Sequence, residues 1–337
     1  MKILKVVFAG LRHGHIVTLY ERLKNDSRFK IVAVCEENAA AAEFAAKSWG
    51  ISTTHSVFSE MLFQVDFDIL AVGDYYSIRG SRVIAALQKG KHILSDKPLC
   101  TSLEELNQIK RLATEKKLAI GLMLDLRLCA GMQAARQLID IGALGDIHAV
   151  NFGGQHPLNY GTRPGWYFEK GKHGGTINDI AIHGLDAVEF LTGEVISEFI
   201  AARTWNAFAV HEPDFQDSAQ LMFALQNGCG CTADVSYAAP DKFGFSTPFY
   251  WRFTLWGSKG VAEFCASDDV VHFYNNITGK IENIPPGESV AGDYLNEFFN
   301  ELNGNSFHYG TSHILHITEA ALKLQRLSVD KKCHVPL

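Results

Sequence analysis

The sequence predicts an α/β fold in two domains: an N-terminal doubly wound parallel sheet, and a C-terminal α+β domain built on an open, mostly antiparallel sheet. The chain has 337 residues, about twice the ~150 typical of one domain. In its first third, short apolar runs alternate with longer helical stretches, which is typical of βαβ units. Further on, longer segments alternate apolar and polar residues, as half-buried antiparallel strands do. We place the domain boundary near residue 125, which gives domains at 1–125 and 126–337.

Near-continuous apolar runs mark the strands expected in the first domain, because both faces of a parallel sheet are buried. They span Ile3–Ala9, Lys30–Cys35, Asp68–Val72, His92–Ser95 and Ala119–Leu122. Two helices are clearest between them. Asn38–Trp49 has an Asn at its start and Gly50 after its end, and Thr101–Lys116 opens with the capping-box sequence T-S-L-E-E.

Alternating segments indicate the strands of the second domain, and Asn227-Gly228 supplies a hairpin signal between two of them. The strands are expected at Ile147–Gly153, Val195–Trp205, Asp217–Leu225, Cys229–Tyr237 and Phe249–Trp256. Helices are expected at Ala130–Ile141, at Gly175–Leu191, near Tyr294 after a Pro285-Pro286-Gly287 loop, and from Thr311 onward.

Composition limits the partners of the protein. With 31 Lys and Arg against 37 Asp and Glu, the net charge is −6, and no basic block is present, so nucleic acid and membranes are not expected partners. No apolar run reaches the ~18 residues of a membrane span, and the start M-K-I-L-K-V-V-F-A-G is interpreted as a first strand rather than a signal peptide. The seven cysteines are scattered, without a Cys-x2-Cys pair, which predicts reduced thiols and a cytoplasmic protein.

A glycine-containing loop follows the first strand. It reads Gly10-Leu11-Arg12-His13-Gly14-His15 and leads into a helix. A strand, a tight turn and a helix N-terminus can hold a dinucleotide pyrophosphate, because glycine lets the backbone approach and free N–H groups face the anion. The full G-x-G-x-x-G pattern is absent, and the loop alone fits an ordinary strand-to-helix turn equally well.

Glu36 strengthens the cofactor interpretation. It directly follows the second strand, about 20 residues beyond the loop, as a ribose-binding carboxylate should. An acid there favours NAD over NADP, and Glu37 would also repel a 2′-phosphate, whereas Arg12 leaves NADP possible. The alternative is that Glu36 is a solvated charge at the start of a loop.

Lys97 is the first candidate catalytic residue. It lies in Ser95-Asp96-Lys97-Pro98, directly after a predicted parallel strand, and ligands of open α/β sheets bind at the carboxyl ends of the strands. A residue before proline is also held extended, which directs its side chain. The alternative is a surface lysine in a strand-to-helix loop.

Asp179 and His183 form a second candidate group. They lie four residues apart in the predicted helix that follows Gly174-Gly175, where side chains meet. A carboxylate beside an imidazole fixes its tautomer and stabilises its charged form, as a general base near neutral pH requires. The alternative is a buried contact with a structural role.

Five motifs follow one another along the chain: a G-x-x-x-G loop, V-C-E, K-H-I-L-S-D-K-P-L, G-A-L-G-D-I and G-G-T-I-N-D-I-A-I-H-G-L-D. This ordered set extends through nearly the whole chain and resembles the glucose-fructose oxidoreductase / inositol dehydrogenase (Gfo/Idh/MocA) family. The resemblance implies an NAD(P)-binding Rossmann domain, a second domain with an open sheet, and a cis Lys97–Pro98 bond. It also implies that the helix over 311–328 runs back toward the first domain.

The resemblance implies an NAD(P)-dependent dehydrogenase that acts on a secondary hydroxyl of a sugar, polyol or derivative. His183 would take the hydroxyl proton, Lys97 would hydrogen-bond the same oxygen, and Asp179 would orient His183 and bind substrate with it. The cofactor would contact Gly10, Leu11, Arg12, His13, Glu36, Asp74, Asp96 and Lys97.

Two segments depart from the family pattern. Gly73-Asp74-Tyr75-Tyr76 replaces the usual A-T-P-N, and Gly121–Asp125 replaces G-F-N-R-R. An acid at 74 near the pyrophosphate is electrostatically unfavourable unless it bonds a ribose hydroxyl or Arg12. These changes predict a divergent branch with altered cofactor or substrate geometry.

An aromatic segment before the Asp/His helix is the candidate substrate loop. Its Tyr160, Arg163 and Trp166 could stack on a sugar ring and bind a hydroxyl or carboxylate, although a packed surface loop is the alternative.

We predict no metal centre, because no His or Cys set converges at ligand spacing. We predict a homodimer or homotetramer by analogy of fold. Two other functions stay open: redox-neutral elimination or glycoside cleavage with tightly bound NAD, and non-catalytic ligand sensing.

Overall fold

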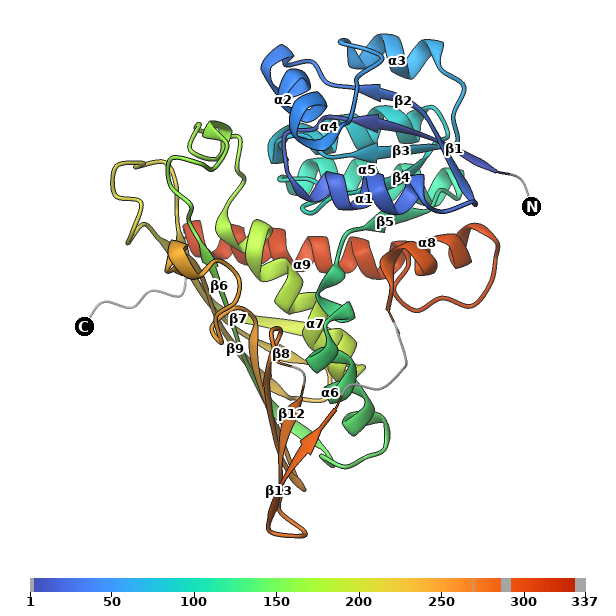
Figure 1. Ribbon diagram of the computed structural model, residues 1–337. Helices are drawn as coiled ribbons and strands as arrows, with labels where there is room; N and C mark the ends of the chain where they lie inside the picture. The colour runs from blue at the N-terminus through green and yellow to red at the C-terminus, as the bar shows by residue number, and fades with distance from the viewer. Residues whose placement is uncertain (1–2, 269, 286–291, 331–337) are drawn as a thin grey trace. The chain divides into compact units, whose positions relative to one another are not determined.

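The computed structural model describes residues 3–268, 270–285 and 292–330 of the chain (Figure 1). The chain divides into two compact units. Unit 1 comprises Met1–Met123, Pro164–Gly174 and Tyr294–Thr318, and unit 2 comprises Leu124–Arg163, Gly175–Asp293 and Glu319–Leu337. Two segments from later in the chain, Pro164–Gly174 and Tyr294–Thr318, therefore belong with the N-terminal unit. The predicted division into domains at 1–125 and 126–337 stays a prediction.

Unit 1 contains the predicted parallel sheet. Its five strands lie in the order β2-β1-β3-β4-β5 and all pair in parallel. They are β1 (Leu4–Ala9), β2 (Phe29–Cys35), β3 (Ile69–Val72), β4 (His92–Ser95) and β5 (Ile120–Leu122). The order reverses between β1 and β3, and ligands of such sheets bind at this switch point, outside the carboxyl ends of the strands.

Helices α1 to α5 follow the first strands along the chain, and α8 comes from near residue 300. They are α1 (His15–Lys24), α2 (Ala39–Trp49), α3 (Phe58–Gln64), α4 (Tyr76–Gln88), α5 (Leu103–Lys116) and α8 (Tyr294–Leu302), with a short 3-10 helix at Gly165–Tyr167. Asn38 accepts a hydrogen bond from the Ala41 N–H, so the predicted Asn cap is confirmed. The helix expected at Thr101–Lys116 begins at Leu103, and Ser102 of its T-S-L-E-E start accepts the Glu105 N–H.

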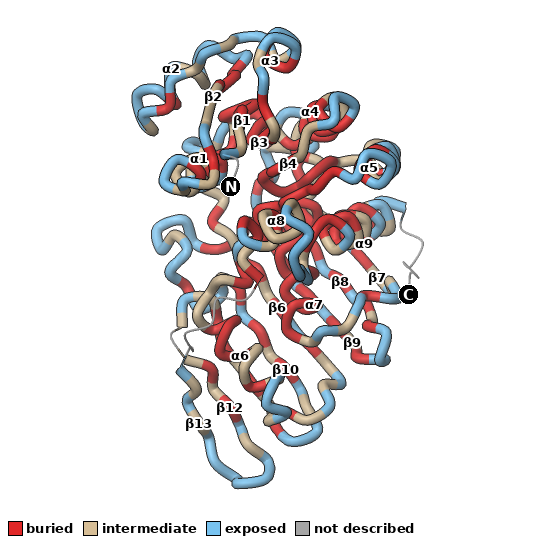
Figure 2. Tube along the Cα trace, turned by 90° about the vertical axis from the view of Figure 1, so that its right-hand side faces the viewer, coloured by how far each residue is buried: buried red, intermediate tan, exposed pale blue. Residues whose placement is uncertain are grey.

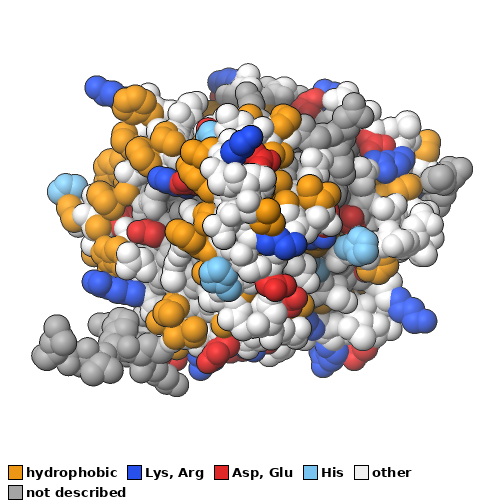
Figure 3. Space-filling model, turned by 90° about the horizontal axis from the view of Figure 1, so that it is seen from below, with side chains coloured by type: hydrophobic (Ala, Val, Ile, Leu, Met, Phe, Trp, Pro, Cys, Tyr) orange, Lys and Arg blue, Asp and Glu red, His pale blue; other side chains and the backbone are white. Residues whose placement is uncertain are grey.

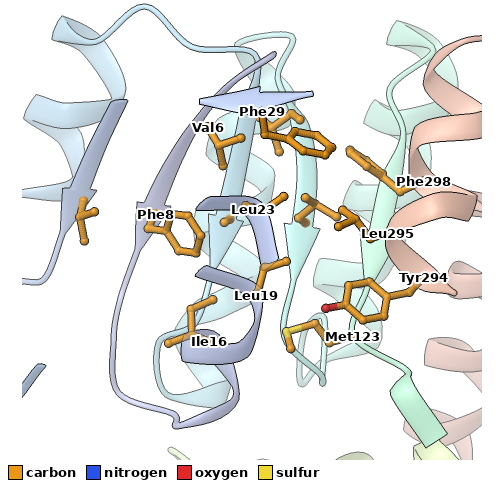
Figure 4. Packing of buried hydrophobic residues seen from close by; sticks show 14 of the residues in the cluster. Val6, Phe8, Ile16, Leu19, Leu23, Phe29, Met123, Tyr294, Leu295 and Phe298 are labelled. Carbon is orange, nitrogen blue, oxygen red and sulfur yellow. The ribbon is translucent and has the colours of Figure 1, made fainter. Parts of the chain in front are cut away.

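The core of unit 1 lies between its sheet and helices α1 and α8. Val6, Phe8 and Leu19 belong to one buried cluster with Leu295 and Phe298 of α8 (Figure 4). Buried residues concentrate in the strands, whereas α2 is mostly exposed (Figure 2). The helix expected near Tyr294 is thus confirmed, and its apolar face supplies part of this core.

Unit 2 contains an eight-stranded sheet in the order β13-β12-β11-β10-β6-β9-β8-β7. All neighbours are antiparallel except β6 and β9, which are parallel. The strands are β6 (Ile147–Pro157), β7 (Ile196–Trp205), β8 (Ser218–Leu225), β9 (Gly230–Ala239), β10 (Arg252–Gly257), β11 (Gly260–Cys265), β12 (Val271–Asn275) and β13 (Lys280–Ile284). The mostly antiparallel sheet is confirmed.

Two strand predictions need correction. The last three strands, β11 to β13, were not predicted. Of these, β12 and β13 are short and carry several polar residues, and β13 lies at the sheet edge. The strand expected at Phe249–Trp256 begins only at Arg252, since Trp251 adopts a left-handed conformation with φ of 52°, which interrupts an extended backbone.

The helices of unit 2 include α6 (Ala130–Asp140) and α7 (Ile182–Thr192), with 3-10 helices at Asp125–Leu128 and Asp241–Phe243. The helix predicted at Gly175–Leu191 is α-helical only in its second part, because Ile177–Ala181 forms a π-helix. Gln325 Oε1 accepts the Ile177 N–H there, at 3.1 Å. The last helix, α9 (Thr311–Asp330), confirms the prediction and passes from unit 1 into unit 2 after Thr318.

The surface and the cysteines agree with the composition. Within the described ranges, no helix is long and apolar enough to cross a membrane. On the face shown in Figure 3, Lys and Arg side chains are scattered among acidic and hydrophobic ones. Six cysteines are free thiols, and Cys333 and the Pro286-Gly287 part of the predicted loop lie outside the described residues.

Candidate active site

The loop after β1 approaches the neighbouring strands closely at Gly10. Gly10 has φ of 83° and donates its N–H to the Cys35 carbonyl at 2.8 Å. A Cβ at this position would lie 2.4 Å from the Cβ of Asp74. Both the left-handed backbone and the lack of space therefore require glycine here.

Glu36 is bound by the same loop. Its carboxylate accepts the Leu11 N–H at 2.7 Å, the Arg12 Nε–H at 3.0 Å and the Asn38 N–H at 2.8 Å. The side chain is buried, with 3% of the residue exposed, which excludes the alternative of a solvated surface charge. The structure thus brings three predicted residues, Leu11, Arg12 and Glu36, together.

Asp74 is compensated by a cation that the sequence analysis did not name. Arg82 Nη2 lies 2.8 Å from Asp74 Oδ2 and donates to Glu37 Oε2 at 2.8 Å. Burial raises the pKa of Asp74, and the Arg82 charge opposes that rise. The expected protein partner was Arg12, but Arg12 is paired with Glu36 instead.

His13, Asp96 and Arg79 form a buried network below the loop. His13 Nδ1 lies 2.5 Å from Asp96 Oδ2, to which Arg79 Nη2 also donates at 2.9 Å. Burial lowers the pKa of His13 to about 3, so the imidazole is neutral at pH 7. Although burial opposes ionisation of Asp96, His13 and Arg79 hold the pKa of this carboxyl well below its usual value.

The same network includes a set of donors that suits a metal ion. One donor atom each of His13, His15 and Asp96 lie within 4.8 Å of one another, and imidazole and carboxylate are zinc ligands. However, Asp96 Oδ2 already accepts from His13 and from the fully buried Arg79, and this guanidinium compensates the carboxylate charge. We therefore interpret the set as a hydrogen-bonded network, and the expected lack of a metal centre stays a prediction.

Lys97 is held at the end of β4 by its backbone. The Lys97–Pro98 bond is cis, as the family resemblance implies. Arg79 donates to the Lys97 carbonyl at 2.5 Å and, through Nε, to the Asp74 carbonyl at 2.7 Å. Only 4% of Lys97 is exposed, and its Nζ lies 5.7 Å from the centre of the Tyr76 ring. The alternative of a surface lysine is therefore wrong.

Trp166 lies in unit 1, against the candidate cofactor loop. Its indole Nε1 donates to the Arg12 carbonyl at 3.1 Å, and its ring centre is 4.9 Å from that of Tyr76. The Tyr76 hydroxyl hydrogen-bonds His13 Nε2 at 3.1 Å and the Tyr167 hydroxyl at 2.8 Å. These aromatic contacts of Tyr76 and Tyr167 were not predicted.

Asp179 and His183 are both buried in unit 2. The hydroxyl of Tyr237, at the inner face of β9, donates to Asp179 Oδ2. The ring centre of His183 lies 5.8 Å from that of Trp251. Tyr237 and Trp251 were not predicted as site residues. The sequence signal for Tyr237 was its inward-facing place at the end of the predicted Cys229–Tyr237 strand.

The other two substrate candidates differ in their surroundings. Arg163 donates to the carbonyls of Leu158 and Pro157 at 2.6 and 2.7 Å, and its guanidinium carbon lies 5.0 Å from the centre of the Tyr237 ring. Arg163 is therefore next to the tyrosine that binds Asp179. Tyr160 is half exposed, and its hydroxyl donates to Glu212 at 2.9 Å.

Several curated relatives of low sequence identity are dehydrogenases. Levoglucosan dehydrogenase of Pseudarthrobacter phenanthrenivorans is 26% identical over 51% of this chain, but the match covers only 45% of that protein. Trans-1,2-dihydrobenzene-1,2-diol dehydrogenase of Oryctolagus cuniculus is 23% identical over 94% of this chain and 90% of its own. D-glucoside 3-dehydrogenase of Escherichia coli is 26% identical over 74% and 68%.

Solved structures share the whole fold. A proposed oxidoreductase from Erwinia carotovora atroseptica has a TM-score of 0.85 at 22% identity and covers 96% of this chain and 98% of its own. An oxidoreductase from Agrobacterium radiobacter, solved with NAD+, L-tartaric acid and magnesium, has a TM-score of 0.78 at 18% identity, covering 98% and 97%.

Two family models match adjoining parts of the chain. Residues 4–123 match the oxidoreductase family with an NAD-binding Rossmann fold. Residues 132–263 match the Gfo/Idh/MocA C-terminal domain. The first match contains the strands of the parallel sheet, and the second contains strands of the mostly antiparallel sheet. The chain therefore belongs to the Gfo/Idh/MocA family of NAD(P)-dependent oxidoreductases.

Proposed function

We propose that this protein transfers hydride between NAD and a secondary hydroxyl of a sugar, polyol or related compound. The observation that carries the proposal is that Lys97, Asp179 and His183 are all buried and each is held by specific neighbours, Arg79, Tyr237 and Trp251. Ionisable groups buried with such partners are typical of functional sites. The names of two relatives, levoglucosan dehydrogenase and D-glucoside 3-dehydrogenase, support the substrate class.

The residues of unit 1 fit a dinucleotide. No side chain of the described residues caps the N-terminus of α1, where the Ile16 and Val17 N–H groups donate to the His13 and Gly14 carbonyls. A phosphate at this end would face the positive end of the helix dipole. Gly10 permits close approach, and Leu11, Arg12 and His13 complete the loop. Bound NAD supplies the hydride acceptor. We propose that Glu36 holds the ribose hydroxyls and, with Asp74, disfavours the 2′-phosphate of NADP, whereas Asp96 and Lys97 contact the nicotinamide part.

The proposed chemistry needs a proton acceptor and a stabiliser for the substrate oxygen. His183 is proposed to accept the hydroxyl proton, and Lys97 to donate a hydrogen bond to the same oxygen as negative charge develops on it. Asp179 is proposed to orient His183 and bind a neighbouring hydroxyl. The Tyr237 hydroxyl holds one Asp179 oxygen, which fixes the carboxylate for both tasks. Lys97 belongs to unit 1 and the Asp/His pair to unit 2, so their convergence stays a prediction.

The test is a set of variants assayed with NAD and a panel of sugars and polyols, with absorbance followed at the nicotinamide band. We expect Lys97→Ala and His183→Ala to lower kcat by roughly 100-fold or more, while the NAD affinity of His183→Ala, measured by calorimetry, stays near that of wild type. Lys47→Ala and His148→Ala, at exposed positions, are the controls. Retained turnover removes a residue from the mechanism.

Two further outcomes separate the alternatives. A product without net redox change, formed by protein that copurifies with NAD, would replace the dehydrogenase by a redox-neutral enzyme. Normal NAD and sugar binding with no turnover by any form of the protein would favour a ligand sensor.

We also propose that the protein is a homodimer or homotetramer. The strand register puts Met222, Trp256 and Tyr274 on one face of the unit 2 sheet, where all three are exposed. Exposed apolar residues on one sheet face are typical of a protein interface. Light scattering after size-exclusion chromatography measures the mass, and a monomer at micromolar concentration contradicts the proposal.

A further inference from the structure

Trp251 has an unusual backbone and a fully enclosed side chain. It directly precedes β10 and has φ of 52°, yet only 2% of the residue is exposed. A bulky residue in the left-handed region is rare, and such residues cluster at functional sites because the surrounding structure must hold them there. The contacts of the indole ring therefore indicate what this conformation achieves.

The opposite strand leaves room for the indole. Arg252 pairs with Gly153 in the β10–β6 register, so Trp251 faces Gly154. A Cβ on Gly154 would lie 2.6 Å from Trp251 Cζ3 and 2.9 Å from Cη2, closer than atoms in contact allow. A Cβ on Gly153 would meet only the Asp234 carbonyl, at 3.7 Å, which is an ordinary contact. Gly154, but not Gly153, is thus required by the indole.

The ring that occupies this space stands against two imidazoles. Its centre lies 5.8 Å from His183, with an angle of 66° between the planes, and 5.5 Å from His156, with an angle of 87°. Both are edge-to-face arrangements, which aromatic rings prefer. The inner face of the sheet therefore supports the imidazole of His183 through a side chain that is itself fixed by strand geometry.

We propose that Trp251 is a positioning residue for His183, and that Gly154 serves this role by admitting the indole. The role of His183 in the reaction rests on the proposed function. The apolar ring restricts the rotation of the imidazole and excludes water from one side of it, which favours the neutral imidazole that a proton acceptor must be. Asp179, four residues before His183, is bound by Tyr237, which also neighbours His156 and Arg163. Tyr250 lies beside Trp251 and His156, and the variants below leave all these groups unchanged.

Gly154→Ala is the sharpest test, with Gly153→Ala as its matched control on the same strand. We expect Gly154→Ala to move the indole and to lower kcat roughly 10- to 100-fold, as misplaced catalytic groups do, while the NAD dissociation constant stays unchanged. Gly153→Ala is expected to match wild type. Trp251→Leu removes the ring edge and should also lower kcat. Trp251→Phe keeps an aromatic edge, so we expect its kcat to lie between those of Trp251→Leu and the wild-type protein.

A second readout does not need turnover. The imidazole of His183 is titrated by NMR in each folded variant, its signal being assigned by its loss in His183→Gln. We expect the titration midpoint to rise in Gly154→Ala and in Trp251→Leu, because water reaches the ring, and to stay unchanged in Gly153→Ala. If the titration midpoint of His183 in both Gly154→Ala and Trp251→Leu equals that of the wild-type protein, the proposal is overturned. If wild type turns over no substrate, the proposed function fails, and the titration still decides the role of Trp251.

Discussion

The two units hold their candidate residues by different means. In unit 1, Lys97 and the candidate cofactor loop are held by buried charges: Arg79 with Asp96, and Arg82 with Asp74. In unit 2, Asp179 and His183 contact the aromatic side chains of Tyr237 and Trp251. A buried charge that loses its partner is very unfavourable, whereas a ring contact fails gradually as packing loosens. Loss of a charge partner around the unit 1 candidates should therefore affect stability most, whereas a shape change around the unit 2 candidates should affect mainly catalysis.

Replacement of Arg79 by Leu is expected to have the largest effect. The guanidinium is fully buried and bonds Asp96 and the carbonyls of Asp74 and Lys97. Its loss leaves the Asp96 carboxylate without its cation, which should lower the free energy of unfolding by about 3–5 kcal/mol. Urea denaturation measures this, with Arg111→Leu at an exposed position of α5 as the control. A loss below about 1 kcal/mol would show that buried charge does not organise unit 1.

Gly10→Ala tests the close approach in the cofactor loop. The variant combines a left-handed backbone with a Cβ 2.4 Å from Asp74, and should lose about 2–4 kcal/mol of unfolding free energy together with NAD affinity. Gly14→Ala is its control, because φ is −63° there and nothing lies within 4 Å of the added Cβ. Equal stability of the two variants would contradict the tight contact.

The stability of unit 1 should depend on pH through His13. Its pKa falls to about 3 in the folded protein because of burial, against about 6.5 unfolded. Below pH 6.5 the unfolded chain therefore binds a proton that the folded chain does not, and stability is lost as the pH falls toward 3. Between pH 7 and pH 5 this loss is about 2 kcal/mol.

His13→Asn, which keeps a donor toward Asp96, should remove most of this pH dependence. His92, whose pKa burial also lowers, keeps its own contribution in the variant. The depressed pKa of Asp96 acts only below its ordinary value near 3.8, outside the measured window. Unfolding curves at pH 5, 6 and 7 for both proteins provide the comparison, and identical slopes would refute the assignment to His13.

Glu36→Gln is expected to have the smallest effect. Without the carboxylate charge, Arg12 loses its ion-pair partner and can attract a 2′-phosphate. We expect the ratio of the NAD and NADP dissociation constants to shift about tenfold toward NADP, or about 1.4 kcal/mol. Glu60→Gln, on the exposed side of α3, is the control. An unchanged ratio would mean that Glu36 serves only to hold the loop.

Lys97, Glu36, Asp179 and His183 could be selected as candidates from the sequence because each stands in a local motif at a predictable place in its element. Their partners could not. Arg79 and Arg82 look like ordinary helix residues, and Tyr237 and Trp251 look like core aromatics, until distant segments are brought together. The candidate substrate residues show the same difference. Trp166 lies beside Arg12, whereas Arg163 lies beside the tyrosine that binds Asp179.

The amino-acid pattern was sufficient for the features that depend on neighbours along the chain: the five apolar strands of unit 1, the Asn38 cap, and the hairpin at Asn227-Gly228. Propensity, capping and turn chemistry act within a few residues, so the pattern contains them. The folded chain was needed to find the late start of β10, the π-helix at Ile177–Ala181 and the partners of the buried ionisable groups. These depend on packing and electrostatics between residues far apart in sequence, which no local pattern specifies.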